Sequence, residues 1–235
     1  MSGAIYSPAH NCLCFGTRLP VLLLPANRNG SWSFHVVLIN YSSLGYTIFT
    51  THVVGNVRGV TQLDDILNVV CAKSSIIKMF TADTLSPLGE GIHVEGMRDP
   101  TDIVACHHDR QLYVGDCDCI WRVSLSFGHH SCVKWLTGLD VNRLSLTLHR
   151  LLVTSEWPPR LRQYSTTDGQ LVREVPLPSY VKEVYSAAET TRGTFVLCHQ
   201  GTSEDEDQYA VSELFTLCHS YIKITPVMKQ HKDHA

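Results

Sequence analysis

The feature that most constrains the fold of this chain is an internal repeat. A pattern of apolar runs recurs about every 42 residues from Gly59 onwards. Three aligned copies begin at Asp64, Asp99 and Leu144, and a weaker fourth begins near Tyr185. The last strands of the first three copies are about 41 to 43 residues apart and centre on Phe80, Val123 and Tyr164. A period of this length is typical of a β-propeller, in which each repeat forms one small blade. We therefore predict an all-β fold, a propeller of four-stranded antiparallel blades, of which about four are recognisable.

The copy that begins at Asp99 divides into four strands separated by polar turns. The strands are expected at 102–107, 112–116, 120–125 and 132–136, and the turns at 108–111, 117–119 and 128–131. Short antiparallel strands joined by turns of this length form a compact twisted sheet. In the third copy, Asp168-Gly169 lies between two apolar runs and predicts a hairpin.

Composition excludes several classes of protein. The chain has 235 residues, enough for one large β domain or two small ones, with 44% hydrophobic and 17% charged residues, which argues against global disorder. The net charge of −3 is unfavourable for a general nucleic-acid binder. The longest apolar stretch, Leu19–Ala26, is far shorter than the roughly 20 residues needed to cross a bilayer. We expect neither a nucleic acid nor a membrane as the partner.

Nine cysteines are present, without the even spacing of a disulfide framework. Several fall inside apolar runs, where a free cysteine acts as a small hydrophobe. These observations favour reduced thiols and a cytoplasmic location. Two glycosylation triplets, at Asn29 and Asn40, leave an extracellular location open.

Three segments are expected along the chain. Residues 1–57 contain strand-like runs that do not match the repeat, so we expect a diverged N-terminal segment there. Residues 58–225 hold the blades, and residues 226–235 form a C-terminal tail.

One copy resembles the NHL-type propeller repeat, which begins with a proline and carries an apolar strand, a D-x-x-LYV-x-D element and an apolar pair before an arginine. The residues that carry the resemblance are Pro100, Ile103, Asp109, Leu112-Tyr-Val114, Asp116 and Ile120-Trp-Arg122. The resemblance covers one blade well and two partly. It implies six blades, or roughly 250 residues of repeats. Either residues 1–57 form a diverged blade, or the ring is incomplete and its open sheet edges favour self-association. A fragment of a longer protein is a further alternative.

Four cysteines and four histidines lie close together in the sequence of the second copy: Cys106, His107, His108, Cys117, Cys119, His129, His130 and Cys132. Zinc takes such ligands. The C-x-C and H-H spacings are not those that clamp one ion, and the blade topology separates the turns, so we expect no metal and no cofactor. If a metal were bound, the candidates would be His107, His108, His129 and His130. A redox pair of Cys117 and Cys119 is disfavoured because no helix is available to lower a thiol pKa.

No nucleophile elbow, zinc-protease motif, P-loop or dinucleotide fingerprint is present. A metal-dependent hydrolase of the six-bladed lactonase type would need acids around a central ion, and Asp102, Asp116 and Asn142 are the conceivable residues. Asp116 is equally suited to capping a turn. Tryptophans such as Trp121, Trp135 and Trp157 are more often part of a blade core than of a binding surface. Trp157 lies in a Trp-Pro-Pro turn and is the aromatic residue with the most exposed position in the sequence.

The sequence therefore favours a non-catalytic scaffold that binds another protein or peptide on its turn surface, with Trp157 as the candidate binding residue. The alternatives are the metal-dependent hydrolase and a non-functional fragment of a longer propeller.

Overall fold

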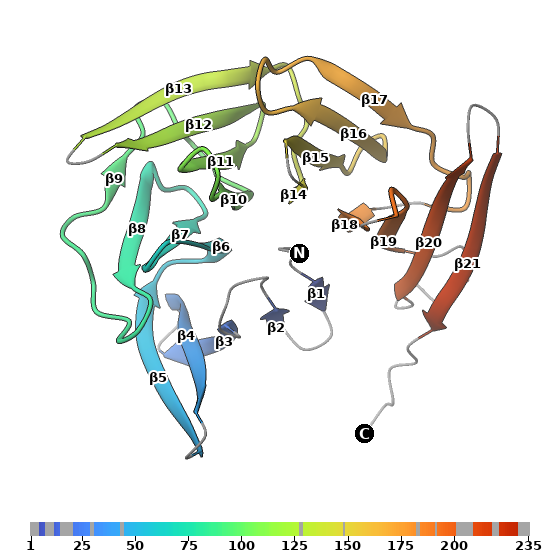
Figure 1. Ribbon diagram of the computed structural model, residues 1–235. Helices are drawn as coiled ribbons and strands as arrows, with labels where there is room; N and C mark the ends of the chain where they lie inside the picture. The colour runs from blue at the N-terminus through green and yellow to red at the C-terminus, as the bar shows by residue number, and fades with distance from the viewer. Residues whose placement is uncertain are drawn as a thin grey trace. The chain divides into compact units, whose positions relative to one another are not determined.

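The computed structural model describes the backbone over most of the chain (Figure 1). The described ranges are 5–7, 12–14, 21–28, 31–42, 45–126, 129–147, 149–181, 184–190, 192–200, 209–217 and 221–229. Side chains are described within these ranges from residue 51 to residue 199, except at 52 and 54. Over these ranges the chain forms strands, turns and loops without a helix, so no described helix is long and apolar enough to cross a membrane.

The chain divides into two compact units, Met1–Leu139 and Asp140–Ala235. The first unit holds a two-stranded sheet, a three-stranded sheet and two four-stranded sheets. Their strands are β1 (Ile5–Ser7) and β2 (Cys12–Cys14); β3 (Val21–Arg28), β4 (Ser31–Ser42) and β5 (Gly45–Val54); β6 (Val57–Leu63), β7 (Ile66–Cys71), β8 (Ile76–Thr81) and β9 (Ile92–His93); and β10 (Asp102–Cys106), β11 (Gln111–Asp116), β12 (Cys119–Ser126) and β13 (His129–Thr137).

The second unit holds two more four-stranded sheets. Their strands are β14 (Arg143–Thr147), β15 (Arg150–Ser155), β16 (Arg160–Ser165) and β17 (Leu171–Val175); and β18 (Val184–Glu189), β19 (Phe195–Gln200), β20 (Tyr209–Leu217) and β21 (Tyr221–Lys229). In all four of the larger sheets, successive strands pair antiparallel in chain order, as in a propeller blade (Figure 1). The four predicted blades are thereby confirmed.

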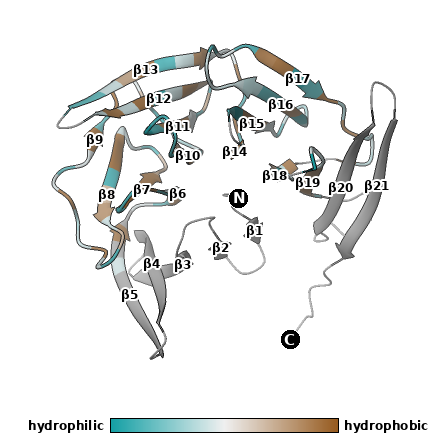
Figure 2. Cartoon of the chain, in the orientation of Figure 1, coloured by the Kyte–Doolittle hydropathy of each residue, from teal (hydrophilic) through white to brown (hydrophobic). Residues whose placement is uncertain are grey.

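The second strand of a blade explains why the repeat is visible in the sequence. In β7, β11 and β15 the last five residues of the strand are all buried. A strand covered on both faces is apolar almost throughout rather than alternating. The last strands β13 and β17 lie at the edges of their sheets and are mostly exposed. In Figure 2, β17 begins with a hydrophobic segment, Leu171 and Val172, which are 49% and 46% exposed.

Within each unit, neighbouring blades pack face to face. In the first unit β6 lies against β10, and a Cβ atom on Gly59 would come within 2.8 Å of both Asp102 Oδ1 and Ile103 N. Glycine is required there because the two backbones approach so closely. In the second unit β14 and β15 pack against β18, and Asn142 Nδ2 donates to Val184 O at 2.9 Å. A continuous buried cluster in the second unit joins these blades through Leu152, Leu161, Val175, Val181, Val184, Ala187, Phe195 and Leu197.

Two predicted turn assignments are wrong. His129 and His130 were expected in a turn, but they begin β13, since pairing continues to Ser126↔His129 and leaves only residues 127–128 between the strands. Cys119 was also expected in a turn, but it begins β12 and pairs with Asp116. Both hairpins are tighter than expected, because the ladder hydrogen bonds extend one to three residues further.

The third-copy hairpin is confirmed. Gly169 has φ +75° and its N–H donates to Ser165 O at 2.9 Å, while Gln170 N donates to Asp168 Oδ1 at 3.1 Å. The strands β6 and β21 begin and end slightly outside the 58–225 range, at Val57 and Lys229.

Candidate functional site

The loops that lead into β10 and β14 are equivalent, and this equivalence locates the most unusual turn in the chain. Thr101 N donates to Gly115 O at 2.8 Å, and Asn142 N donates to Thr154 O at the same distance. The hydrogen bonds therefore align Asp99 with Asp140 in these loops, and they align Asp116 with Ser155 at the ends of the second strands, β11 and β15.

In the first of these blades the loop closes on a carboxylate. Asp116 is 1% exposed, and its oxygens accept hydrogen bonds from the backbone N–H groups of Asp99 (2.8 Å), Cys117 (2.9 Å) and Arg98 (3.0 Å) and from the Trp121 indole (3.2 Å). Burial works to raise the pKa of Asp116, but these donors outweigh it and hold the pKa below its ordinary value. Asp116 is a turn-capping group, as one interpretation of the sequence anticipated.

The corresponding turn of the next blade is larger. Two residues, 117–118, join β11 to β12, whereas four residues, Glu156–Pro159, join β15 to β16. The longer turn contains two prolines, and the Trp157–Pro158 peptide bond is cis. The Trp157 side chain is 65% exposed, the largest value among the exposed large hydrophobic residues that the structure describes.

Two hydrogen bonds to Asp140 hold the N-terminal side of this larger turn. Ser155 Oγ donates to Asp140 O, and Trp157 N donates to Asp140 Oδ2 at 3.3 Å. Ser155 is 5% exposed, whereas Asp140 and the Trp157 ring are exposed. The Asp140 carboxylate is thereby fixed beside the Trp157 backbone.

The turn carries negative charge. Asp140 and Glu156 are both exposed, and neither forms an ion pair with any residue whose side chain is described. The cation nearest to Glu156 in the sequence, Arg160, lies 3.9 Å from Glu174 Oε1. The site therefore combines an exposed indole, the carboxylate of the adjacent residue Glu156, and the Asp140 carboxylate, which accepts a hydrogen bond from the Trp157 backbone.

The histidine candidates do not converge. His107 and His108 lie in the β10–β11 turn, His129 and His130 begin β13, and all four are exposed. Strand β12 separates β11 from β13 in the sheet. Over the described side chains, no group of three or more His, Cys, Asp or Glu residues could hold a metal ion.

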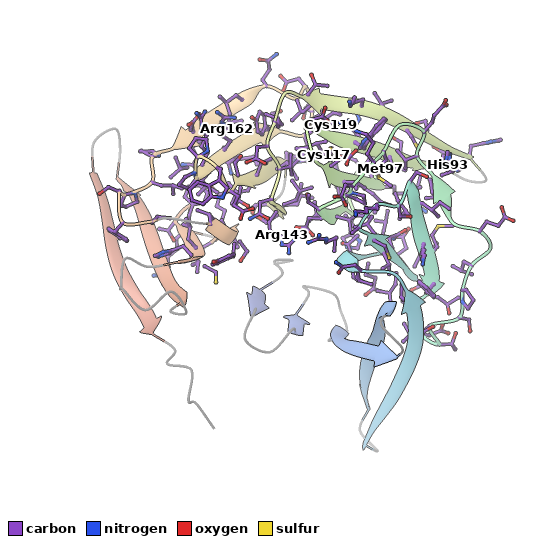
Figure 3. The ribbon with its side chains drawn as sticks, turned by 180° about the vertical axis from the view of Figure 1, so that it is seen from behind. His93, Met97, Cys117, Cys119, Arg143 and Arg162 are labelled. Atoms are coloured by element: carbon purple, nitrogen blue, oxygen red, sulfur yellow. The ribbon has the colours of Figure 1, made fainter. Side chains whose placement is uncertain are left out.

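Cys117 lies in the β11–β12 turn, and Cys119 begins β12; both are labelled in Figure 3. Cys117 is exposed, and Cys119 is buried. Burial raises the pKa of Cys119 to about 12, and burial and the nearby Asp116 raise the pKa of Cys117. Neither thiol is activated as a nucleophile or a redox group. All six cysteines with described side chains are free.

The three residues considered for a hydrolase site all form hydrogen bonds within the fold. Asp116 accepts hydrogen bonds from its four donors, Asp102 Oδ1 accepts from Ile103 N at 2.9 Å, and Asn142 connects two blades of the second unit.

Of the two tryptophans expected in the core, Trp121 is buried and Trp135 is only half-buried. Trp121 is 7% exposed, and the half-buried Trp135 lies with its ring centroid 5.0 Å from that of Tyr113.

Sequence reasoning identified Trp157 and its exposure but missed Asp140 and Glu156. A signal was present: Asp140 occupies the same repeat position as Asp99, and the turn that follows its blade's second strand is longer than its counterpart. Comparing the turns of successive repeats would have drawn attention to all three residues.

Comparison with known proteins identifies the fold. No protein-family model matches the chain, and no curated protein sequence matches it. A chain in the crystal structure of a nidogen–laminin complex has a TM-score of 0.57 and 13% identity, over 82% of this chain and 73% of that one. Hydrazine synthase of Kuenenia stuttgartiensis has a TM-score of 0.65 and 11% identity, over 95% of this chain and 65% of that one. A protein described as a 6-phosphogluconolactonase from Bacteroides uniformis has a TM-score of 0.65 and 10% identity, over 90% of this chain and 68% of that one.

At these identities the likeness concerns the fold alone. Together with the four antiparallel four-stranded sheets, it shows that the chain is an all-β protein with the β-propeller fold.

Proposed function

We propose that this protein is a non-catalytic scaffold that binds another protein or a peptide through the Trp157 turn. The observation that carries the proposal is a tryptophan that is 65% exposed on a turn anchored by Asp140. Tryptophan is among the residues most enriched at binding hot spots, because its large ring buries much apolar area with few rotatable bonds. Rigid anchoring reduces the ordering that binding would otherwise require.

The turn also departs from the pattern of its own repeat. The equivalent residue pair in the preceding blade, Cys117-Asp118, makes a two-residue connection, while the Trp157 turn has two more residues. Loops vary on a rigid scaffold where function is located. The extra length and the outward ring support a binding role over a purely structural one.

A phage-displayed random peptide library, selected on the full chain, tests the proposal. Trp157→Ala should abolish the enrichment of peptides that the unaltered chain selects. Val133→Ala is the matched control, because Val133 is 47% exposed and lies on β13, an edge strand of the other unit. It should select the same peptides. Equal enrichment by Trp157→Ala would contradict the proposal.

A hydrolase of the lactonase type is the second candidate, and the structural likeness to a protein described as a 6-phosphogluconolactonase favours it. Lactone hydrolysis by the purified chain that disappears on treatment with EDTA would support this candidate. The absence of turnover with added divalent metal would count against it.

We further propose that the repeats are of the NHL type and that the protein resides in the cytoplasm. The D-x-x-LYV-x-D element supports the NHL assignment, because its last residue, Asp116, caps the turn that follows β11. Six free cysteines among those described support the second. Fluorescence microscopy of the tagged full chain tests the location; a secretory-compartment signal would refute it.

Self-association through an open sheet edge is also proposed. Strand β17 lies at the edge of its sheet and exposes Leu171 and Val172. Exposed apolar edge strands favour pairing between copies. Light scattering should give more than one copy per particle, and Val172→Lys should restore a single copy. A monomeric unaltered chain would refute the idea.

A further inference from the structure

We infer that the Trp157 turn recognises a cationic side chain, an arginine or a lysine, of a peptide partner. This inference rests on the proposed function and adds the chemistry of the ligand. The site that would hold the cation is made of the Trp157 ring and the carboxylates of Asp140 and Glu156.

The first argument is the placement of the charges. Trp157 N donates to Asp140 Oδ2 at 3.3 Å, which holds this carboxylate next to the residue that carries the ring. Glu156 is the adjacent residue and is exposed as well. No described cation pairs with either carboxylate. Negative groups beside an aromatic face favour a positive ligand and disfavour an acidic one.

The second argument comes from the other tryptophans with described side chains. Lys134 Nζ lies 5.8 Å from the centroid of the Trp121 ring, and Arg122 Cζ lies 5.8 Å from that of Trp135. Each of these two rings therefore has a cation–π partner in its own blade. For Trp157 no such cation is found among the residues that the structure describes.

The third argument is that the neighbouring arginines already have partners. Arg160 and Arg162 both approach Glu174, at 3.9 Å and 3.0 Å. The Arg173 guanidinium is taken up by Glu189 at 2.8 Å and by the Phe195 ring at 4.6 Å. The arginines on β16 and β17 thus have partners of their own, and no ion pair among the described side chains supplies a cation to Asp140 or Glu156.

The probe for testing the inference is a positional hexapeptide library in which one position is fixed as arginine, lysine, citrulline or glutamate. Citrulline keeps the shape of arginine without its charge. The full chain should bind the arginine and lysine pools about five- to thirtyfold more tightly than the citrulline pool, as expected for a cation against an aromatic face with carboxylates beside it. The glutamate pool should bind most weakly.

Variants separate charge from shape. The double change Asp140→Asn and Glu156→Gln removes both charges, and the asparagine oxygen can still accept from Trp157 N. It should reduce the preference for arginine over citrulline to less than about threefold. Glu174→Gln is the matched control, because it removes an exposed carboxylate of the same unit that already has arginine partners. The control should keep the preference. Thermal unfolding of each variant checks that it folds.

The outcomes distinguish this inference from the proposed function. Binding that needs Trp157 but shows equal affinity for the arginine and citrulline pools would overturn the inference and leave the proposed function standing. Binding that is unchanged in Trp157→Ala would overturn both.

Discussion

Asp116→Asn is the substitution for which the structure allows the most detailed prediction. The carboxylate is 1% exposed and accepts from four donors, three of them backbone N–H groups. An asparagine offers one oxygen and places an NH2 group against the donors that faced the other oxygen. Two donors would then lack an acceptor, at about 1 to 3 kcal/mol each if both were fully buried. Because the three backbone hydrogen bonds are only partly buried, unfolding should become easier by about 2 to 4 kcal/mol.

Urea denaturation measures this effect. With a slope of about 2 to 3 kcal/mol per molar urea, a loss of 3 kcal/mol lowers the midpoint by about 1 to 1.5 M. Asp118→Asn is the matched control, two residues away but exposed, with its carboxylate in surface ion pairs to Arg98 and Lys134. Surface ion pairs of this kind add little to the free energy of unfolding, so Asp118→Asn should have the same urea midpoint as the wild-type protein. Equal midpoints for the two variants would refute the reasoning.

The same residue predicts a pH dependence. The pKa of Asp116 is lower in the folded chain than its ordinary value of about 3.9. A depressed folded pKa stabilises the fold at pH values above the unfolded pKa, and the contribution is lost as the pH falls through the folded pKa. The difference in stability between wild type and Asp116→Asn should therefore be largest near neutral pH and shrink below about pH 4. A difference that stays constant down to pH 2 would show that the carboxylate charge is not involved.

Three further predictions concern packing, a buried ion pair and the thiols. Gly59→Ala should destabilise the fold by about 1 to 3 kcal/mol in urea titrations, because its Cβ would press on the backbone of β10; a neutral result would contradict the close approach. Glu189→Ala should lower the free energy of unfolding by about 2 kcal/mol, because the partly buried Arg173 guanidinium loses its carboxylate partner. An unchanged melting temperature in calorimetry would contradict this expectation. In a titration with a thiol reagent, Cys117→Ser should remove one rapidly reacting thiol and Cys119→Ser should remove none, because Cys117 is exposed and Cys119 is buried. Identical reaction traces for the two variants would exclude this assignment.

Much of the architecture could be predicted because it depends on local pattern. The runs ILNVVC, QLYVGD and RLLVTS have the same burial in the structure, and their near-continuous apolar character is what made the repeat visible. Strand ends were less predictable. His129 and His130 look like turn residues, yet they pair with β12, because a ladder continues wherever the partner strand offers hydrogen-bonding groups.

The period of the repeat, the antiparallel order within each blade and the exposed turn position of Trp157 could be predicted from the amino-acid pattern, since they follow from apolar runs and turn residues. The pairing of a particular loop with a particular turn came from the three-dimensional packing. Asp140 and Trp157 are 17 residues apart, and they meet because the loop into a blade passes over the turn between that blade's second and third strands. Such contacts depend on how the strands pack rather than on the order of neighbouring residues, and the partners of Asp116 and of the Trp157 turn were therefore beyond what the pattern alone could specify.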